Sequence, residues 1–205
     1  MTVSKALVVA AVAVATTAGC QSNVAMPTRS HIASVATHDR PRPTPSQRVG
    51  ISALPFSLVV NTHQGAISAP VAPLVASVHA DGHADPIDPP HATAREWLTA
   101  VWIAQSAYPD RPSTGTSYVY GHACHHHACA FTGLRNVRSG DAITVTTTAR
   151  ELSYHVCATG ISPKSGDLEV PRCANGAPDL VLVTCEYEGG DVSANNLVVV
   201  ATSTD

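Results

Sequence analysis

The hydrophobic positions after residue 50 follow the pattern of short β-strands. Residues 51–60 and 66–78 are apolar, β-branched stretches that are interrupted by Gly and Pro. Residues 141–148 and 151–159 alternate apolar and polar side chains, which is typical of the two arms of a half-buried hairpin. Further strands are expected over residues 116–120, 180–187 and 196–202.

Residues 92–107 have a different pattern, because they contain no Gly or Pro and place several large apolar side chains near one side. This pattern predicts a helix that is anchored in the core by Trp97 and Trp102. A short helical turn is expected over residues 131–137 and a long loop over 163–178. Seven or eight short strands with one inserted helix predict a mainly β protein, a closed barrel with an insertion.

The first 20 residues have the features of an export signal. A short start that carries Lys5 is followed by an apolar run over residues 6–15, and small residues then lead to Cys20. The run is too short for a membrane-spanning helix and predicts a signal peptide. The small residues before Cys20 also resemble a bacterial lipoprotein site, at which the cysteine becomes lipidated. The alternative is an ordinary secretory signal that is removed together with Cys20.

Residues 21–48 are rich in Pro, Ser, Thr, Arg and His and show no apolar period, so a flexible linker is expected there. The folded domain is then residues 49–205. The whole chain has 205 residues, of which 13% are charged, with 12 Lys and Arg against 15 Asp and Glu. This balance gives no basic face and argues against a nucleic-acid partner. Contact with a membrane is expected only through a lipid on Cys20.

The cysteine count suggests a free thiol. An exported protein usually has its thiols oxidised in pairs, and removal of Cys20 leaves an odd number of cysteines, five. The spacing favours Cys124 with Cys129 and Cys157 with Cys173, although four cysteines allow three pairings. Cys185 then remains as the unpaired cysteine and as a candidate nucleophile. The alternative for Cys185 is a buried structural thiol.

The segment Cys124-His-His-His-Ala-Cys129 offers a second chemistry, since thiolates and imidazoles are good ligands for zinc and copper. Neighbouring side chains on an extended chain point in opposite directions, so these five groups cannot all reach one ion. A disulfide with solvated histidines is the favoured interpretation. The alternative is an extracytoplasmic metal-binding lipoprotein.

The order of several motifs resembles the sortases, and most closely those of classes E and F. The motifs are Gly115-Thr-Ser-Tyr-Val-Tyr-Gly-His122, Phe131-Thr-Gly-Leu134, Ser139-Gly-Asp-Ala-Ile-Thr-Val145, Leu152-Ser-Tyr-His-Val156, Leu180-Val-Leu-Val-Thr-Cys185 and Asn196-Leu-Val-Val-Val200. The resemblance extends over about residues 51–201. It implies an eight-stranded barrel in which His122 follows one strand and Cys185 ends another, both facing a substrate groove.

The resemblance also implies cysteine transpeptidation without a cofactor. Cys185 attacks a peptide bond in a sorting motif near the C-terminus of an exported protein, and a thioacyl enzyme forms. An amine of a peptidoglycan precursor or of another protein then resolves it, while His122 acts as acid and base in turn. Thr184 positions substrate or donates toward the oxyanion. The expected location is the outer face of the cell membrane, with a lipid anchor, or the secreted fraction.

The sequence departs from the family at one position, because sortases carry an arginine on the last strand and residues 186–205 contain no Arg or Lys. The segment Ser193-Ala-Asn-Asn196 stands there, so Asn195 or Asn196 is a candidate neutral donor. Arg111, Arg135 and Arg138 are candidates from other loops. Loss of an oxyanion donor commonly costs about 10²–10³ in turnover. The alternative function is therefore a sortase-fold binding module without turnover.

Overall fold

The computed structural model describes residues 55–77, 86–111, 115–174, 176–188 and 191–204. The expected signal peptide, the lipidation at Cys20 and the linker over residues 21–48 lie outside the described residues. No described helix is long and apolar enough to cross a membrane.

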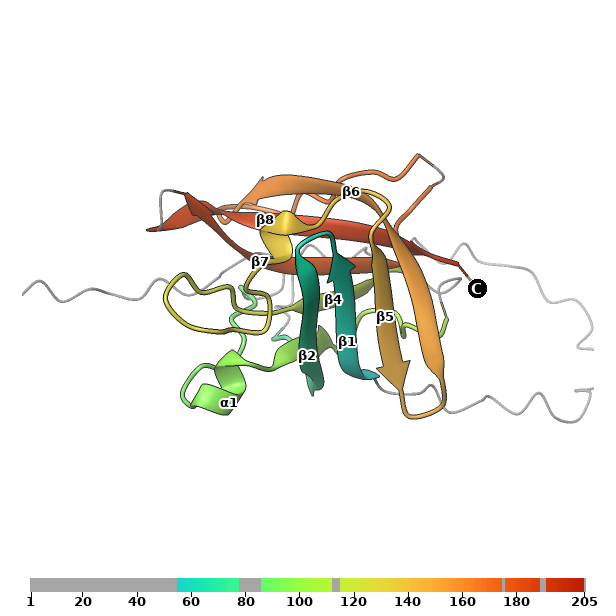
Figure 1. Ribbon diagram of the computed structural model, residues 1–205, viewed down its shortest axis with the longest axis horizontal. Helices are drawn as coiled ribbons and strands as arrows, with labels where there is room; N and C mark the ends of the chain where they lie inside the picture. The colour runs from blue at the N-terminus through green and yellow to red at the C-terminus, as the bar shows by residue number, and fades with distance from the viewer. Residues whose placement is uncertain (1–54, 78–85, 112–114, 175, 189–190, 205) are drawn as a thin grey trace, which may run out of the picture.

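Eight strands close into a barrel in the order β1-β2-β3-β4-β7-β8-β6-β5 (Figure 1). The closed eight-stranded barrel predicted from the sequence is thus confirmed. The strands are β1 Pro55–Thr62, β2 Gly65–Leu74, β3 Ala100–Ile103, β4 Ser117–Tyr120, β5 Ala142–Thr147, β6 Glu151–Pro163, β7 Leu180–Glu188 and β8 Asp191–Ser203.

Most neighbours in the barrel are antiparallel, but two pairs are parallel, β2 with β3 and β4 with β7. Each parallel pair needs a crossover connection. The crossover from β2 to β3 contains the described residues 86–99, and the chain between β4 and β7 contains the 3₁₀ turn η2 (Leu134–Asn136) and the β5–β6 hairpin. Strands β4 and β7 thereby bring together residues about 60 positions apart in the sequence.

The helix expected over residues 92–107 is wrong in extent. Only α1, Ala94–Trp97, is helical, and its start is fixed by Thr93 and Glu96, which form a capping box. The following Ala100–Ile103 is strand β3, and all four of its side chains are buried. Three of these four residues are β-branched or aromatic, which favours a strand that packs on both faces. Trp102 is a core residue as predicted, but it lies on a strand.

Two hydrophobic clusters lie on opposite faces of the sheet. On β7, Leu180 and Leu182 belong to the cluster inside the barrel, while Val181 and Val183 belong to the cluster outside it. The outer cluster is covered by the loop over residues 164–179, which contributes Leu168 among others. Because side chains alternate along a strand, residues two positions apart at the end of β7 share a face, so Cys185 is on the face of Val181 and Val183.

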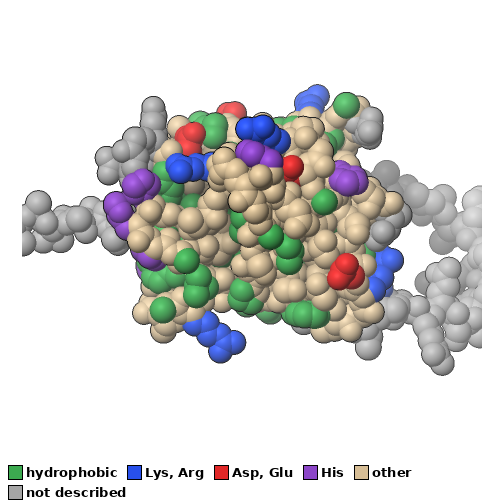
Figure 2. Space-filling model, in the orientation of Figure 1, with side chains coloured by type: hydrophobic (Ala, Val, Ile, Leu, Met, Phe, Trp, Pro, Cys, Tyr) green, Lys and Arg blue, Asp and Glu red, His purple; other side chains and the backbone are tan. Residues whose placement is uncertain are grey.

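Charged side chains are scattered on the face drawn in Figure 2, and histidines gather at one edge of it. On this face, among the described residues, Lys and Arg do not gather into a patch. This distribution agrees with the expectation that the protein does not bind nucleic acid, which stays a prediction.

Candidate active site

The ends of β4 and β7 are joined by hydrogen bonds that continue past the last paired residues. Tyr120 is opposite Val183 in the parallel register. The amide of Gly121 donates to the carbonyl of Val183 (3.1 Å), and the Thr184 hydroxyl donates to the carbonyl of Gly121 (2.7 Å). Extension of this register by two residues brings His122 opposite Cys185, on the outer face that Tyr120 and Val183 share.

Gly121 lets the chain turn closely past an aromatic ring. A Cβ atom at this position would lie 2.7 Å from the ring of Phe131, which is itself fully buried. The amide of Phe131 donates to the carbonyl of His122 (2.8 Å). The Gly-His sequence is therefore required by packing as well as by chemistry, because a larger residue would displace the backbone that carries His122.

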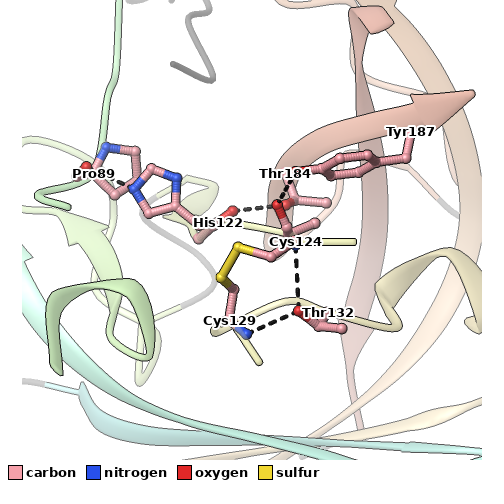
Figure 3. Close-up of a disulfide and its surroundings, with 9 residues drawn as sticks. Pro89, His122, Cys124, Cys129, Thr132, Thr184 and Tyr187 are labelled. Carbon is pink, nitrogen blue, oxygen red and sulfur yellow. Dashed lines mark hydrogen bonds between the residues drawn. A yellow bond between two sulfur atoms is a disulfide. The ribbon is translucent and has the colours of Figure 1, made fainter. Parts of the chain in front are cut away.

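The His122 imidazole is enclosed by the crossover between β2 and β3. His122 is only 3% exposed, and its Nε2 lies 2.8 Å from the carbonyl oxygen of Pro89 (Figure 3). The ring centroid of Trp97 is 4.5 Å from that of His122. Burial lowers the pKa of His122, and the hydrogen bond to Pro89 opposes that shift only in part. The neutral imidazole is thereby favoured.

Cys185 is buried and lines a cavity of about 590 Å³ at the end of the barrel. Thr184, Glu186 and Leu197 line the same cavity, and so does Arg135 from η2. His122 does not line it; its ring is directed toward Pro89 and Trp97 instead. The structure thus places the two predicted catalytic residues at adjacent strand ends, with the imidazole held on the crossover.

The expectation that Cys185 carries a free thiol is wrong for this structure. Cys185 is disulfide-bonded, and the described residues contain no free cysteine. The odd count that suggested a free thiol depended on the removal of Cys20, which lies outside the described residues. Any chemistry at Cys185 therefore belongs to the reduced protein.

The two other predicted disulfides are present, Cys124–Cys129 and Cys157–Cys173. The amides of Cys124 and Cys129 both donate to the hydroxyl of Thr132 (3.3 and 2.9 Å), which holds the first disulfide in a tight loop (Figure 3). The second disulfide ties the loop over residues 164–179 to β6. With both sulfurs of the first pair oxidised, the Cys-His run offers no thiolate ligand to a metal, and the metal-lipoprotein alternative loses its strongest ligands.

Among the candidate substrate residues, Asn196 is best placed. It is directly opposite Cys185 in the register of β7 and β8 and is fully buried. The side-chain amide of Asn195 donates instead to the Glu186 carboxylate (3.3 Å). Thr184 uses its hydroxyl proton on the carbonyl of Gly121, so in this structure it joins two strand ends.

Sequence reasoning missed the residues that surround His122. Asp88, His91 and Trp97 come from the crossover between β2 and β3, and His91 and Trp97 have ring centroids within 5.5 Å of the imidazole. The sequence around Asp88 reads as a turn-rich loop, and no spacing rule connects it to a histidine 34 positions later.

Comparison with known proteins decides the family. The sequence model of the sortase domain matches residues 67–204. The chain belongs to the sortase family. Sortases are cysteine transpeptidases, and Cys185 and His122 of this sortase both lie within the matched residues.

Solved sortase structures share the fold at low sequence identity. Sortase C-1 from Actinomyces oris is 17% identical with a TM-score of 0.50, and the match covers 73% of each chain. Sortase C1 of Streptococcus agalactiae, in complex with MTSET, is 11% identical with a TM-score of 0.52, over 75% of this chain and 68% of that chain. Sortase C1 from Streptococcus suis is 14% identical with a TM-score of 0.51, over 75% and 74%. No curated protein matches by sequence.

Proposed function

We propose that this sortase, in its reduced form, is an exported cysteine transpeptidase that cleaves a sorting-type peptide motif. The observation that supports the proposal most is the β4–β7 register, which sets the end of one strand, with His122, beside the end of the other, with Cys185. In this proposal the enzyme acts on the C-terminal region of exported proteins and is secreted or held at the membrane by a lipid on Cys20. Membership of class E or F stays a prediction.

The reaction begins when the imidazole of His122 takes the proton of the Cys185 thiol, and the resulting thiolate attacks the carbonyl carbon of the scissile peptide bond. As the tetrahedral intermediate collapses, the C–N bond breaks and the leaving amine takes a proton from His122. The acyl group is then a thioester on Cys185. An acceptor amine attacks this thioester, gives a proton to His122 and releases the thiolate, so that no oxidant or reductant is consumed.

The transition state needs a group that stabilises negative charge on the attacked oxygen. Asn196 lies opposite Cys185 and supplies a neutral amide at the position where the family has its arginine. Arg135 can supply positive charge there, since it is the one Arg or Lys among the described residues that line the Cys185 cavity. Its side chain is exposed. We assign Arg135 to substrate positioning in this cavity and to stabilisation of the charge on the attacked oxygen.

A labelling experiment tests the nucleophile. The protein is reduced, freed of reductant and treated with MTSET, and the modified peptides are mapped by mass spectrometry. A variant that combines Cys124→Ser, Cys129→Ser, Cys157→Ser and Cys173→Ser removes the labels that belong to the two reduced disulfides. We expect Cys185 to react in the native reduced protein, with the label absent in Cys185→Ala. Reaction of Cys185 only after denaturation would contradict the proposal.

Turnover is then measured with sorting-type peptide libraries and an amine acceptor. We expect product that is lost in Cys185→Ala and in His122→Ala. A reduced, folded protein that binds such peptides without turnover would favour the second candidate function, a sortase-fold binding module. The absence of Arg and Lys from residues 186–205 supports that candidate.

A further inference from the structure

Three side chains with metal-ligating atoms meet on the crossover that covers His122. Asp88, His91 and His122 each offer one ligand atom, and these three atoms lie within 4.8 Å of one another. None of the three residues lines the Cys185 cavity. The cluster is therefore separate from the cavity, although it contains the imidazole proposed to act as acid and base.

The donor set fits a divalent transition metal. Two imidazoles and one carboxylate form a three-ligand set that leaves a fourth position for solvent, as in open zinc sites. Oxygen-only sites suit magnesium or calcium, whereas imidazoles favour zinc, copper, iron and nickel. The two histidines therefore favour zinc or a similar transition-metal ion over magnesium or calcium.

The carboxylate has an oxygen that is not satisfied by the protein. Oδ1 of Asp88 is buried and has no hydrogen-bond partner, and Oδ2 lies 3.8 Å from Nδ1 of His91. A buried acceptor without a donor costs free energy, and such a group is usually satisfied by a bound ion or water. A cation held between Asp88 and the two imidazoles would satisfy this oxygen.

The imidazoles are held in place before any ion arrives. The carbonyl oxygen of Pro89 lies 2.8 Å from Nε2 of His122 and 3.2 Å from Nδ1 of His91. The Trp97 ring packs on both, with centroid distances of 4.5 and 5.4 Å. Hydrogen bonds to one nitrogen set the tautomer and leave the other with a lone pair.

An ion can reach the cluster from solvent. The side chain of His91 is 45% exposed and that of Asp88 is 31% exposed, while His122 forms the buried end. The site thus has a closed side at His122 and an open side at His91.

We propose that Asp88, His91 and His122 bind a divalent transition-metal ion, with Zn²⁺ as the best-fitting example. Bound metal occupies the imidazole of His122, so transpeptidation stops until the metal leaves. The binding stands on the cluster alone, whereas the inhibition rests on the proposed function.

Co²⁺ is the probe for binding, because a low-coordinate cobalt site has visible d–d absorption. Co²⁺ is titrated into the full, metal-free chain, and Zn²⁺ is added to displace it. The fluorescence of Trp97, next to both imidazoles, gives a second signal, with Trp97→Phe as its control. We expect one Co²⁺ per chain, displaced by one equivalent of Zn²⁺.

Asp88→Asn and His91→Gln are the decisive variants, since both side chains are partly exposed and outside the strands. We expect each to weaken Co²⁺ binding at least tenfold, the lower end of what loss of even a supporting group costs a metal site. His126→Ala, in the exposed histidine run, is the matched control and should bind as the wild type does. Unchanged binding in both variants, or loss of binding in His126→Ala, would overturn the proposal.

Activity gives a separate result. In the wild type, Zn²⁺ should inhibit turnover, and Asp88→Asn should remove that inhibition at the same Zn²⁺ concentration. A protein that binds Co²⁺ through these residues but has no turnover keeps the metal site and loses the proposed function. If turnover depends on His122 but no cobalt signal appears, the proposed function stands and the metal site is overturned.

Discussion

At the residue scale, positive charge near Cys185 is the feature that separates an enzyme from a binding module. Asn196 is opposite Cys185, and Arg135 is the one Arg or Lys among the described residues that line the Cys185 cavity. The order of the motifs indicated Cys185 and His122, because each follows an apolar strand in the sequence. It could not single out Arg135, since only folding brings η2 to the end of β7.

The variant Arg135→Ala tests the role of this charge. We expect turnover to fall by about a hundredfold or more, since a lost charge-stabilising donor commonly has that effect. Arg138→Ala is the matched control, because Arg138 is also exposed but does not line the cavity. Steady-state kinetics of the two variants measure the difference in turnover. Equal effects would show that Arg135 has no specific role in the reaction.

The buried imidazole of His122 predicts a pH dependence of stability. The pKa of His122 is lowered in the folded protein, mainly by burial, from an ordinary value of 6.5. The unfolded chain therefore binds a proton at a higher pH than the folded chain, and the free energy of unfolding falls as the pH drops below about 6.5. Urea unfolding of metal-free protein should show this fall, and His122→Gln should flatten it. An equally steep fall in the variant would assign the effect to other groups.

At the element scale, strand patterns were the reliable signal and the helix pattern was not. The alternation over 141–148 and 151–159 matched β5 and β6 because one face of each strand is buried and the other is exposed. Residues 100–103 have no such alternation, since β3 is buried on both faces between β2 and β4. An apolar run of that kind looks the same in a buried helix and in a buried strand.

One side-chain hydrogen bond joins the ends of β4 and β7, from the Thr184 hydroxyl to the carbonyl of Gly121. Thr184→Val removes the donor and leaves the carbonyl of Gly121 without its hydroxyl partner, which should cost about 1–3 kcal/mol of unfolding free energy. Turnover should also fall, because this hydrogen bond joins the residues next to His122 and Cys185 and so helps to fix the position of one relative to the other. Thr184→Ser keeps the hydroxyl and should lose less of both. Denaturant unfolding and kinetics of the two variants measure the difference, and a Ser variant as impaired as the Val variant would contradict the role assigned to the hydroxyl.

At the scale of the whole molecule, three separate segments meet at one end of the barrel. The crossover carrying Asp88 and His91, the loop closed by Cys124–Cys129 and the end of β7 contact one another there. The amide of Ala130 donates to the carbonyl of Trp97 (2.9 Å), and the Tyr187 hydroxyl donates to the carbonyl of Ala123 (2.7 Å). The sheet is common to the sortases compared above, at 11–17% identity. The segments at its end therefore determine what this member of the family can bind and when it can react.

In the full chain, with neither processing nor lipid attachment at Cys20, the redox state of the protein should control its activity, because Cys185 is disulfide-bonded in the structure. A disulfide sulfur cannot attack a carbonyl, and two electrons from a thiol reductant are needed to release the thiolate. We expect oxidised protein to be inactive and activity to appear as the ratio of reduced to oxidised glutathione is raised. The disulfides Cys124–Cys129 and Cys157–Cys173 are reduced in the same titration, so it is repeated with Cys124→Ser, Cys129→Ser, Cys157→Ser and Cys173→Ser combined. The same activity midpoint in both proteins assigns the control to Cys185; full activity in oxidised wild type would show that its sulfur is not the nucleophile.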